Sequence, residues 1–318
     1  MIRKRLIYVL FLIAGICSCS TNQPDYKNTS LPFNDRVDDL VSQMTLEEKI
    51  GQLKFEAPAI ERLDVPDYNW WNECLHGVAR SGKATVFPQA IGMAATWDTE
   101  QIYKVSQTIA EEARAKYNDY QKRGKRGIYE GLTFWTPNIN IFRDPRWGRG
   151  METYGEDPYL TGEIGTNFIK GLQGDHEKYF KAIATSKHYV VHSGPEPERH
   201  SFNATTREID FWETYMPGFI KTVQDGGAYS VMCAYNRYDG EACCGSDYLL
   251  NDLLRNKIGF DGYVVSDCGA IRDFYSGHNI VETPAEAAAL GVKSGTDLNC
   301  GDVYPALSEA VEQGLITE

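Results

Sequence analysis

Apolar residues recur along this chain with two spacings. Some segments repeat them every three or four residues, as the buried face of a helix does, and others are short apolar runs typical of buried strands. Helices are predicted near residues 35–43, 98–122, 159–172, 208–224, 247–257 and 284–293. Strands are predicted at residues 132–135, 181–185, 229–234, 263–266 and 296–298. Strands that alternate with helices form parallel sheets, so the pattern predicts an α/β fold, as a barrel or a large doubly wound sheet.

Capping residues refine two of the helix starts. Asn34 is placed to cap the first helix, and Thr45 with Glu48 has the spacing of a capping box before the next one. No Gly-x-Gly-x-x-Gly follows a predicted strand, and no Gly-x-x-x-x-Gly-Lys occurs. Dinucleotides and nucleoside triphosphates therefore lose their usual sequence support as ligands.

The first residues resemble an export signal. Arg3, Lys4 and Arg5 precede an apolar run at residues 6–16, which is too short to span a bilayer. A small residue precedes Cys19, as at a lipoprotein processing site. We therefore expect residues 1–19 to be a lipoprotein-type signal peptide, Cys19 to carry a lipid, and residues 20–30 to be a polar tether. The expected location is the periplasm or the outer membrane, with ordinary cleavage and release as the alternative.

The net charge and the cysteine spacing limit which partners and metal ions the chain is expected to bind. The formal net charge of the whole chain is −12, which argues against nucleic acid and anionic lipid surfaces as partners but not against a neutral sugar. Membrane association is expected only through the lipid at Cys19. Six cysteines follow the signal, and their spacing lacks the paired C-x-x-C of a zinc site. They are Cys74, Cys233, Cys243, Cys244, Cys268 and Cys300.

Polar and aromatic residues follow most of the predicted strands. Lys187 and His188 come after the second strand, Tyr235 after the third, and Asp267 after the fourth. In a barrel these strand ends share one face, where catalytic residues gather. A basic and aromatic rim around one carboxylate suits a sugar, because cations donate to hydroxyls and rings stack on its apolar face. Taken alone, Asp267 is better explained as a cap for the next helix, and the surrounding motifs are needed to favour a chemical role.

Two other pairs have a structural and a chemical interpretation. Arg149 and Glu152 are spaced to pair across one helical turn without touching a ligand. His188 and His192 have the spacing of a helical metal pair, but the residues between them favour a strand and no Glu follows the first His. No metal site and no cofactor are predicted.

Five motifs in order resemble the N-terminal barrel domain of glycoside hydrolase family 3. They are RDPRWGR at 143–149, GEDP at 155–158, KHY at 187–189, VMCAYN at 231–236 and VVSD at 264–267. The resemblance extends from about residue 35 to the end of the chain. It implies a TIM-type (β/α)8 barrel over residues 31–318 and the activity of a retaining, exo-acting β-glycosidase.

The same resemblance implies roles for individual residues. Asp267 matches the family's nucleophile, and Tyr235 is placed to donate a hydrogen bond to its carboxylate. Met232 and Tyr235 match residues that line the pocket. Arg149, Lys187 and His188 match the residues that bind the hydroxyls of the sugar in this family.

Two departures from the family pattern concern the substrate. Many β-glucosidases of the family carry an Asp where this chain has Glu73, and a Trp where it has Cys268. Both residues are similar to the β-xylosidase branch, and the longer Glu73 would tighten the space that the hydroxymethyl group of glucose needs. We expect a β-1,4-xylosidase that releases xylose from non-reducing ends of xylo-oligosaccharides. β-Glucosidase, α-L-arabinofuranosidase and an inactive sugar-binding fragment remain as alternatives.

Two further hypotheses concern partners within the site. Cys268 and Cys300 each follow one of two successive strands, and adjacent parallel strands bring such positions within bridging distance, so a disulfide is expected. In multi-domain family members the general acid comes from the domain after the barrel, so the chain is expected to be truncated and weakly active. The alternative acid is a Glu198–His200 dyad, but the Pro-rich loop around it departs from the family's motif. We therefore expect residues 198–200, His200 among them, to be rim or leaving-group contacts.

Overall fold

The computed structural model describes residues 24–192 and 194–318, and the chain divides into two compact units at Met44 and Thr45. The predicted signal peptide and Cys19 lie outside the described residues. In the first unit, a 3-10 turn, η1 (Asp25–Lys27), precedes helix α1 (Phe33–Ser42). The Tyr26 N–H donates to Asp39 at 2.9 Å, so this part of the predicted tether is attached to α1.

The predicted cap of α1 is wrong. The helix begins directly after Pro32, and Asn34 is its second residue. A proline fixes its own φ and lacks an N–H, so it can precede a helix without a side-chain cap. In the second unit, the predicted capping box is confirmed, because Thr45 and Glu48 exchange hydrogen bonds at the start of α2 (Leu46–Gln52).

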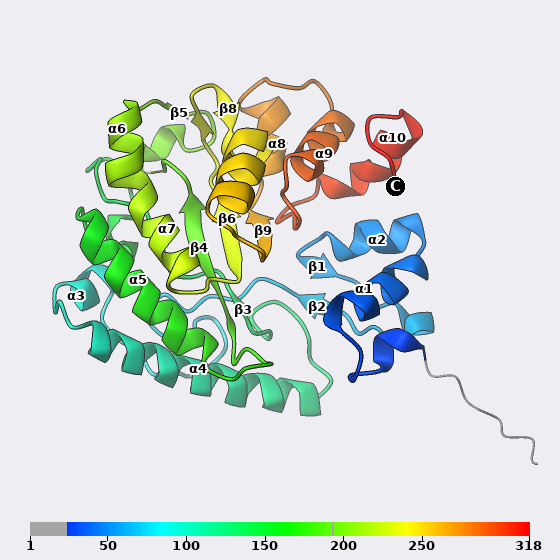
Figure 1. Cartoon of the computed structure of the whole chain (residues 1–318), viewed down its shortest axis with the longest axis horizontal. Coiled ribbons are helices and arrows are strands. Elements are labelled where there is room, and N and C mark those ends of the chain that lie inside the picture. Colours follow the sequence, from blue (N-terminus) through cyan, green and yellow to red (C-terminus); the bar gives the residue numbers. More distant parts are fainter. Residues whose placement is uncertain (1–23, 193) are drawn as a thin grey trace, which may run out of the picture. The chain divides into compact units, whose positions relative to one another are not determined.

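Four parallel strands form the main sheet of the second unit (Figure 1). Their order is β3 (Thr133–Phe134), β4 (Ile183–Tyr189), β6 (Ser230–Cys233) and β9 (Tyr263–Ser266). The prediction of an α/β fold with a parallel sheet is confirmed. β4 extends four residues beyond the predicted end, so Lys187 and His188 belong to the strand itself rather than to the loop after it.

Helices on the outside of the sheet follow the predicted pattern closely. They include α4 (Thr99–Lys122), α5 (Pro158–Gln173) and α9 (Pro284–Lys293), which Asp98, Asp157 and Thr283 cap through their side chains. In Figure 1, α4 lies along α5, and α5 lies along α7 (Met216–Gln224). Both α5 and α7 contact β4, so the helices cover the face of the sheet that bears Val264.

The predicted helix over residues 208–224 is divided. It consists of α6 (Glu208–Asp210), a π-helical turn η5 (Phe211–Tyr215) and α7. Pro217 explains the interruption, because it has no N–H to donate to the carbonyl four residues earlier. The predicted helix at 247–257 is present as a π-helix, η7 (Tyr248–Lys257).

The pattern did not predict the shorter elements. They comprise α3 (Ala90–Ala94), α8 (Ala270–Ser276), α10 (Leu307–Glu312), the pair β1 (Glu56–Ala57) and β2 (Tyr68–Asn69), the sheet of β5 (Asn203–Ala204), β7 (Arg237–Tyr238) and β8 (Glu241–Ala242), and 3-10 turns η2 (Glu61–Leu63), η3 (Gly150–Glu152), η4 (Glu196–Glu198), η6 (Cys243–Gly245) and η8 (Tyr304–Ala306). Among the described residues, no helix has the length and apolar character needed to cross a membrane.

The main sheet continues at both edges through single bridges. Phe134 of β3 pairs in parallel with Asn72, and Val265 of β9 pairs in parallel with Leu298. The predicted strand at 296–298 is therefore reduced to one bridge. The chain leaves β9 immediately afterwards, because Asn299 bridges to Lys54 and donates its N–H to the Leu53 carbonyl at 2.9 Å.

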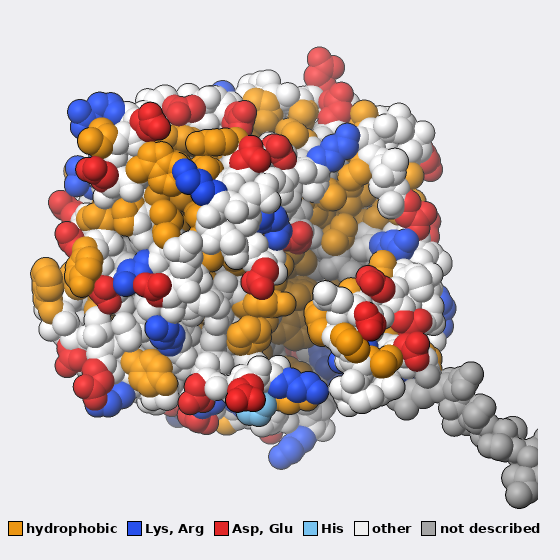
Figure 2. Space-filling model, in the orientation of Figure 1, with side chains coloured by type: hydrophobic (Ala, Val, Ile, Leu, Met, Phe, Trp, Pro, Cys, Tyr) orange, Lys and Arg blue, Asp and Glu red, His pale blue; other side chains and the backbone are white. Residues whose placement is uncertain are grey.

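Two apolar clusters lie on the two faces of the sheet. The larger one fills the space between the sheet and the helices and includes Val264. The smaller one, called the inner cluster below, contains Trp135, Met232, Val265, Leu298 and Cys300. Side chains of Val264 and Val265 enter different clusters because successive residues of a strand point to opposite faces. The surface in Figure 2 carries acidic and basic side chains intermixed, and no basic patch dominates that face.

Candidate active site

A cavity of about 540 Å³ opens at the carboxyl ends of the parallel strands. Eight of the nine predicted site residues line it, namely Glu73, Arg149, Lys187, His188, Met232, Tyr235, Asp267 and Cys268. They come from segments far apart in the chain, and the parallel sheet brings them together because its strands all end at one edge. The cavity walls also contain Arg199, from the segment 198–200 that was expected at the rim, and residues outside the predictions, including Trp71, Trp135 and Glu152.

Asp267 directly follows β9 and is only 7 % exposed. Its backbone N–H donates to the Cys233 carbonyl at 3.1 Å, which attaches it to the neighbouring strand β6. Oδ1 accepts a hydrogen bond from the Cys268 N–H at 2.8 Å. Oδ2 is buried and has no hydrogen-bond partner among the described residues. One oxygen therefore orients the carboxylate, and the other remains available to react.

Opposing influences act on the pKa of Asp267. Burial raises it above the ordinary aspartate value, because the ionised form loses its hydration. Arg149 and Lys187 act in the opposite direction, as do the Cys268 N–H and the Tyr235 hydroxyl. Burial outweighs these groups, so the pKa is raised. The pKa of Tyr235 is raised by burial first and by the nearby Asp267 second, which keeps its phenol protonated.

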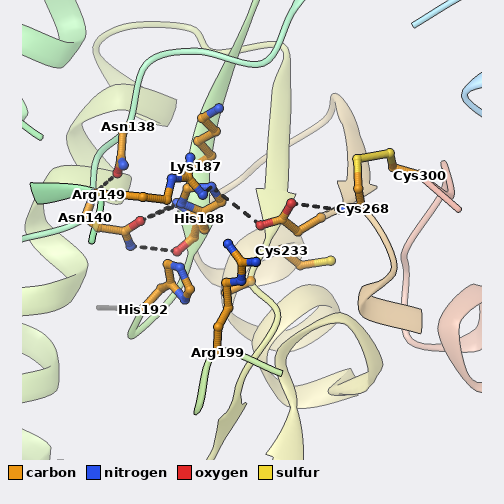
Figure 3. Close-up of polar contacts among 12 residues, drawn as sticks. Asn138, Asn140, Arg149, Lys187, His188, His192, Arg199, Cys233, Cys268 and Cys300 are labelled. Atoms are coloured by element: carbon orange, nitrogen blue, oxygen red, sulfur yellow. Dashed lines mark hydrogen bonds and ion pairs between the residues drawn. A yellow bond between two sulfur atoms is a disulfide. The ribbon is translucent and has the colours of Figure 1, made fainter. Parts of the chain in front are cut away.

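His188 is held as one neutral tautomer. Its backbone N–H donates to Asn140 Oδ1 at 2.8 Å, and its carbonyl accepts from Asn140 Nδ2 at 2.8 Å, which fixes the orientation of that amide. His188 Nδ1 therefore donates to the same Oδ1 at 2.9 Å (Figure 3). Nε2 is left to accept from Arg149 at 3.2 Å and lies 3.6 Å from Asp267 Oδ2. Burial and the neighbouring cations lower the pKa of His188 well below its usual value.

Arg149 both pairs with Glu152 and faces the cavity, so its structural and its chemical interpretation are compatible. It forms a two-pronged ion pair with Glu152, at 2.9 Å for Nε and 2.6 Å for the second nitrogen. Its remaining nitrogen reaches His188, so the guanidinium also faces the cavity. Glu152 is lowered in pKa, because Arg149 outweighs the opposing effect of burial. The pair thus fixes a cation beside Asp267 and leaves Glu152 ionised.

Lys187 and Glu73 form a second charged pair in the cavity. Lys187 Nζ lies 3.6 Å from Glu73 Oε2, and only 4 % of the lysine side chain is exposed. The other oxygen of Glu73 accepts from Trp71 Nε1 at 3.0 Å. Trp71 in turn stacks on Trp135, with ring centres 5.3 Å apart. Glu73 is therefore held between a buried cation and an aromatic wall, in an orientation suited to accept hydrogen bonds from a sugar.

The predicted disulfide between Cys268 and Cys300 is present (Figure 3). It joins the residue after the Asp267 carboxylate to the inner cluster. A second disulfide, Cys233–Cys244, was missed. The sequence carries little signal for it, because Cys243 and Cys244 are adjacent and only the path of the chain after β6 decides which of them faces Cys233. Cys74 and Cys243 are buried free thiols.

His200 is the one predicted site residue that lies beside the cavity rather than in its wall. It does not line the cavity, and its side chain is half exposed. Its Nδ1 bonds to Asp273 at 2.8 Å, and its ring packs edge-to-face with that of Tyr235, with ring centres 4.6 Å apart. The adjacent Arg199 does line the cavity, and its guanidinium lies over the Tyr235 ring at 5.3 Å. Arg199 and His200 were enough to predict that this loop lies at the site. The sequence did not indicate which of the two side chains lines the cavity.

The His188 and His192 rings lie 4.9 Å apart. His192 Nδ1 is bound to the amide oxygen of Asn236 at 3.0 Å, as His188 Nδ1 is to that of Asn140. Burial lowers the pKa of His192 to about 4. Across residues 24–192 and 194–318, no cluster of His, Cys, Asp and Glu has the arrangement of a metal site.

Comparison with known proteins decides the family. The model of the glycosyl hydrolase family 3 N-terminal domain matches residues 39–318. The chain belongs to glycosyl hydrolase family 3. It is 47 % identical to a xylan 1,4-beta-xylosidase from Xylanibacter ruminicola, over 98 % of this chain and 37 % of that protein. It is 41 % identical to a beta-xylosidase/alpha-L-arabinofuranosidase from Medicago sativa, over 94 % of this chain and 40 % of that protein.

Solved structures of this family resemble the chain as well. A GH3 exo-beta-xylosidase in complex with a xylobiose aziridine probe superposes with a TM-score of 0.84 at 34 % identity, covering 91 % of this chain and 39 % of that one. A beta-glucosidase from Erythrobacter marinus gives 0.77 at 28 % identity, covering 92 % and 44 %. The family 3 chain spans less than half the length of the Xylanibacter and Medicago relatives.

Proposed function

We propose that this chain carries the catalytic site of a retaining, exo-acting β-xylosidase that releases xylose from the non-reducing ends of xylo-oligosaccharides. The observation that carries the proposal is the buried, unpartnered Oδ2 of Asp267, directed into a cavity with fixed cations and an aromatic wall. The names of the relatives support xylose as the sugar.

The proposed reaction starts at Asp267. Oδ2 attacks the anomeric carbon, the bond to the leaving oxygen breaks, and a covalent glycosyl-enzyme forms. Water then attacks the same carbon and restores the Asp267 carboxylate, so the anomeric configuration is retained. Arg149, Lys187 and the fixed His188 hold the hydroxyls of the sugar, while Tyr235 and Met232 line its pocket.

Protonation of the leaving oxygen needs a second group. The other two carboxylates of the cavity are both paired with cations, Glu152 with Arg149 and Glu73 with Lys187. The pKa of Glu152 is lowered, so this carboxylate stays ionised and is a poor proton donor. We therefore expect this chain alone to react fastest with xylosides whose leaving groups depart without protonation.

Xylose is favoured over glucose by the walls beside Asp267. Glu73 is fixed by Trp71 and Lys187, and Cys268 is tied to Cys300, so neither wall can withdraw easily to admit a hydroxymethyl group. α-L-Arabinofuranosidase activity is the second candidate, because a 41 % identical relative bears both names. β-Glucosidase activity is less favoured by these walls.

We further propose that the sheet closes into the TIM-type barrel of residues 31–318. Beyond β3, Phe134 bridges to Asn72, and beyond β9, Val265 bridges to Leu298. Asn299 bridges to Lys54, the Trp70 N–H donates to the Phe55 carbonyl, and β1 pairs with β2. These contacts support a continuous ring of hydrogen-bonded neighbours around the inner cluster.

The location of the protein stays a proposal from its sequence. The cationic start, the apolar run and Cys19 support export and a lipid anchor in the periplasm or outer membrane. The intermixed surface charge favours a neutral carbohydrate over nucleic acid as partner.

A mechanism-based probe tests the proposed activity. Incubation with 2,4-dinitrophenyl 2-deoxy-2-fluoro-xyloside should attach one fluoroxylosyl group to Asp267, as detected by peptide mass spectrometry. Asp267→Asn should remain unlabelled and still bind xylose in calorimetry. Xylose binding by the wild-type chain without any labelling would instead identify a sugar-binding fragment. Faster labelling by the corresponding fluoroglucoside would favour a β-glucosidase.

A further inference from the structure

A hydrogen bond outside the cavity joins two segments that shape it. The first segment is the loop after β4, residues 194–202, which contains η4 and carries Arg199 into the cavity. The second is α8, which begins three residues after Asp267. His200 of the loop and Asp273 of the helix meet at 2.8 Å, between Nδ1 and Oδ2. We call this pair the latch.

The contact between the two segments is close over more than one residue. A Cβ on Gly277, at the end of α8, would lie 2.2 Å from the His200 carbonyl oxygen, so only glycine allows the loop to approach there. The Asp273 carbonyl accepts from the N–H groups of Gly277 and His278 at 2.9 and 2.7 Å. Asp273 itself is 6 % exposed and thus occupies a fixed, buried position.

Tyr235 connects the latch to the reacting carboxylate. The centre of its ring lies 4.6 Å from the centre of the His200 ring and 5.3 Å from the Arg199 guanidinium. Its hydroxyl is one of the groups that stabilise ionised Asp267. A shift of the 194–202 loop would therefore move both Arg199 and the support of the Tyr235 ring at once.

We infer that His200 and Asp273 are positioning residues, and that their hydrogen bond holds Arg199 and Tyr235 in the arrangement that Asp267 needs for nucleophilic attack. This inference rests on the proposed function. Neither His200 nor Asp273 lines the cavity, so the effect of the latch passes through Arg199 and Tyr235, which do. Reaction rates depend steeply on such alignment, and misplacement by about 1 Å costs up to about a hundredfold.

The rate of covalent labelling tests the latch in this chain. The readout is the first-order rate constant for labelling of Asp267 at a saturating concentration of the dinitrophenyl fluoroxyloside. His200→Ala and Asp273→Ala should each lower it about tenfold. The double variant should lose no more than either single one, because both remove the same contact. His200→Asn should recover the rate to within about threefold, since its Nδ2 can replace Nδ1 as the donor to Asp273.

His176→Ala is the matched control, because that histidine lies in the exposed loop between α5 and β4, before β4 rather than after it. It should label at the wild-type rate. A merely structural role would lower the labelled fraction or the melting temperature and leave the rate constant unchanged, which would overturn the inference. Additive losses in the double variant would overturn it too.

A leaving-group comparison separates positioning from proton donation. A misaligned nucleophile slows labelling by the dinitrophenyl and the less reactive 4-nitrophenyl fluoroxylosides by the same factor. If His200→Ala slowed only the 4-nitrophenyl reagent, His200 would be a proton donor and the inference would be wrong. If the wild-type chain were not labelled by either reagent, the proposed function itself would fail. If every latch variant were labelled at the wild-type rate, the inference about the latch would be wrong and the proposed function would still stand.

Discussion

Some single residues of the site destabilise the fold through the same features that make them reactive. Asp267 is buried with one unpartnered oxygen, an arrangement that disfavours its charge, yet the proposed chemistry requires that charge. His188 is a second example, because its hydrogen bonds with Asn140 hold it neutral between Arg149 and Asp267. A neutral imidazole at this position can accept a hydrogen bond without adding a third positive charge to the cavity.

The raised pKa of Asp267 has a consequence for stability. Because the folded chain binds this proton more tightly than the unfolded chain does, the free energy of unfolding falls as pH rises from the ordinary aspartate value through the higher folded value. Above that folded pKa the cost is present in full. Asp267→Asn should therefore melt at a higher temperature than wild type at pH 7, with a difference that disappears below about pH 4.

Scanning calorimetry across this pH range measures the effect. Asp302→Asn is a suitable control, because Arg272 lowers the pKa of Asp302 and its substitution should destabilise the chain at pH 7. If Asp267→Asn were less stable than wild type at pH 7, the balance between burial and the cations around Asp267 would have the opposite sign.

Glu73 is the residue at which sugar specificity can be tested. Glu73→Asp shortens the side chain by one methylene and should enlarge the space beside the sugar ring. The ratio of kcat/KM for 2,4-dinitrophenyl glucoside over xyloside should rise about tenfold, since one methylene corresponds to about 1–3 kcal/mol. Glu73→Gln keeps the length and should leave that ratio nearly unchanged. Equal ratios in wild type and Glu73→Asp would mean that another wall excludes glucose.

The ends of the strands and helices determine where the site residues lie. β4 continues through Lys187 and His188, so both side chains are set by the strand rather than by a loop. α8 begins immediately after the turn that follows Asp267 and returns the chain toward the 194–202 loop. The disulfide between Cys268 and Cys300 joins the start of this turn to the segment after Leu298.

Removal of that disulfide should cost stability. The bridge closes a segment with a sequence separation of 32 residues, and the loss of such a loop constraint corresponds to about 4 kcal/mol in the chain-entropy account. The free energy of unfolding of the Cys268→Ala/Cys300→Ala variant, measured in urea, should be lower by that amount, and the variant should admit glucosides more readily. Cys74→Ala/Cys243→Ala, which removes two free thiols, is the control for lost burial. Equal losses in both variants would assign the effect to packing rather than to the bridge.

At the scale of the whole molecule, the proposed barrel depends on a few contacts. Four parallel strands form the main sheet, and single bridges supply the remaining pairings. The Phe55 N–H donates to the Asn299 carbonyl at 3.0 Å and the Asn299 N–H to the Leu53 carbonyl at 2.9 Å. These two bonds join the segment after β9 to the segment before β1.

Hydrogen exchange tests whether the ring is closed in solution. The amides of Phe55 and Asn299 should exchange within about tenfold of the rate of Ser266, whose N–H bonds to Leu298 in the same ring. The amide of Gly240 lies at an exposed turn and, among the described residues, donates only to the exposed side chain of Asn203, at 2.8 Å, so it should exchange much faster. Exchange of Phe55 and Asn299 at the rate of Gly240 would indicate an open sheet.

The sequence by itself determined the alternation of helices and strands, the family, and eight of the residues that line the cavity. These follow from local patterns, because apolar spacing, capping and short motifs act within a few residues. Even locally, Pro217 and Pro32 changed helix boundaries that apolar spacing alone predicted differently.

Only the tertiary structure decided how the residues meet. It selected Cys244 rather than Cys243 as the partner of Cys233, turned Arg199 inward and His200 toward Asp273, and paired Glu152 with Arg149 within the cavity wall. It also reduced the strand predicted at 296–298 to one bridge, because Asn299 bonds elsewhere. Side-chain direction and partner choice depend on segments tens of residues apart, and such distances are set by packing of the whole sheet rather than by any local pattern.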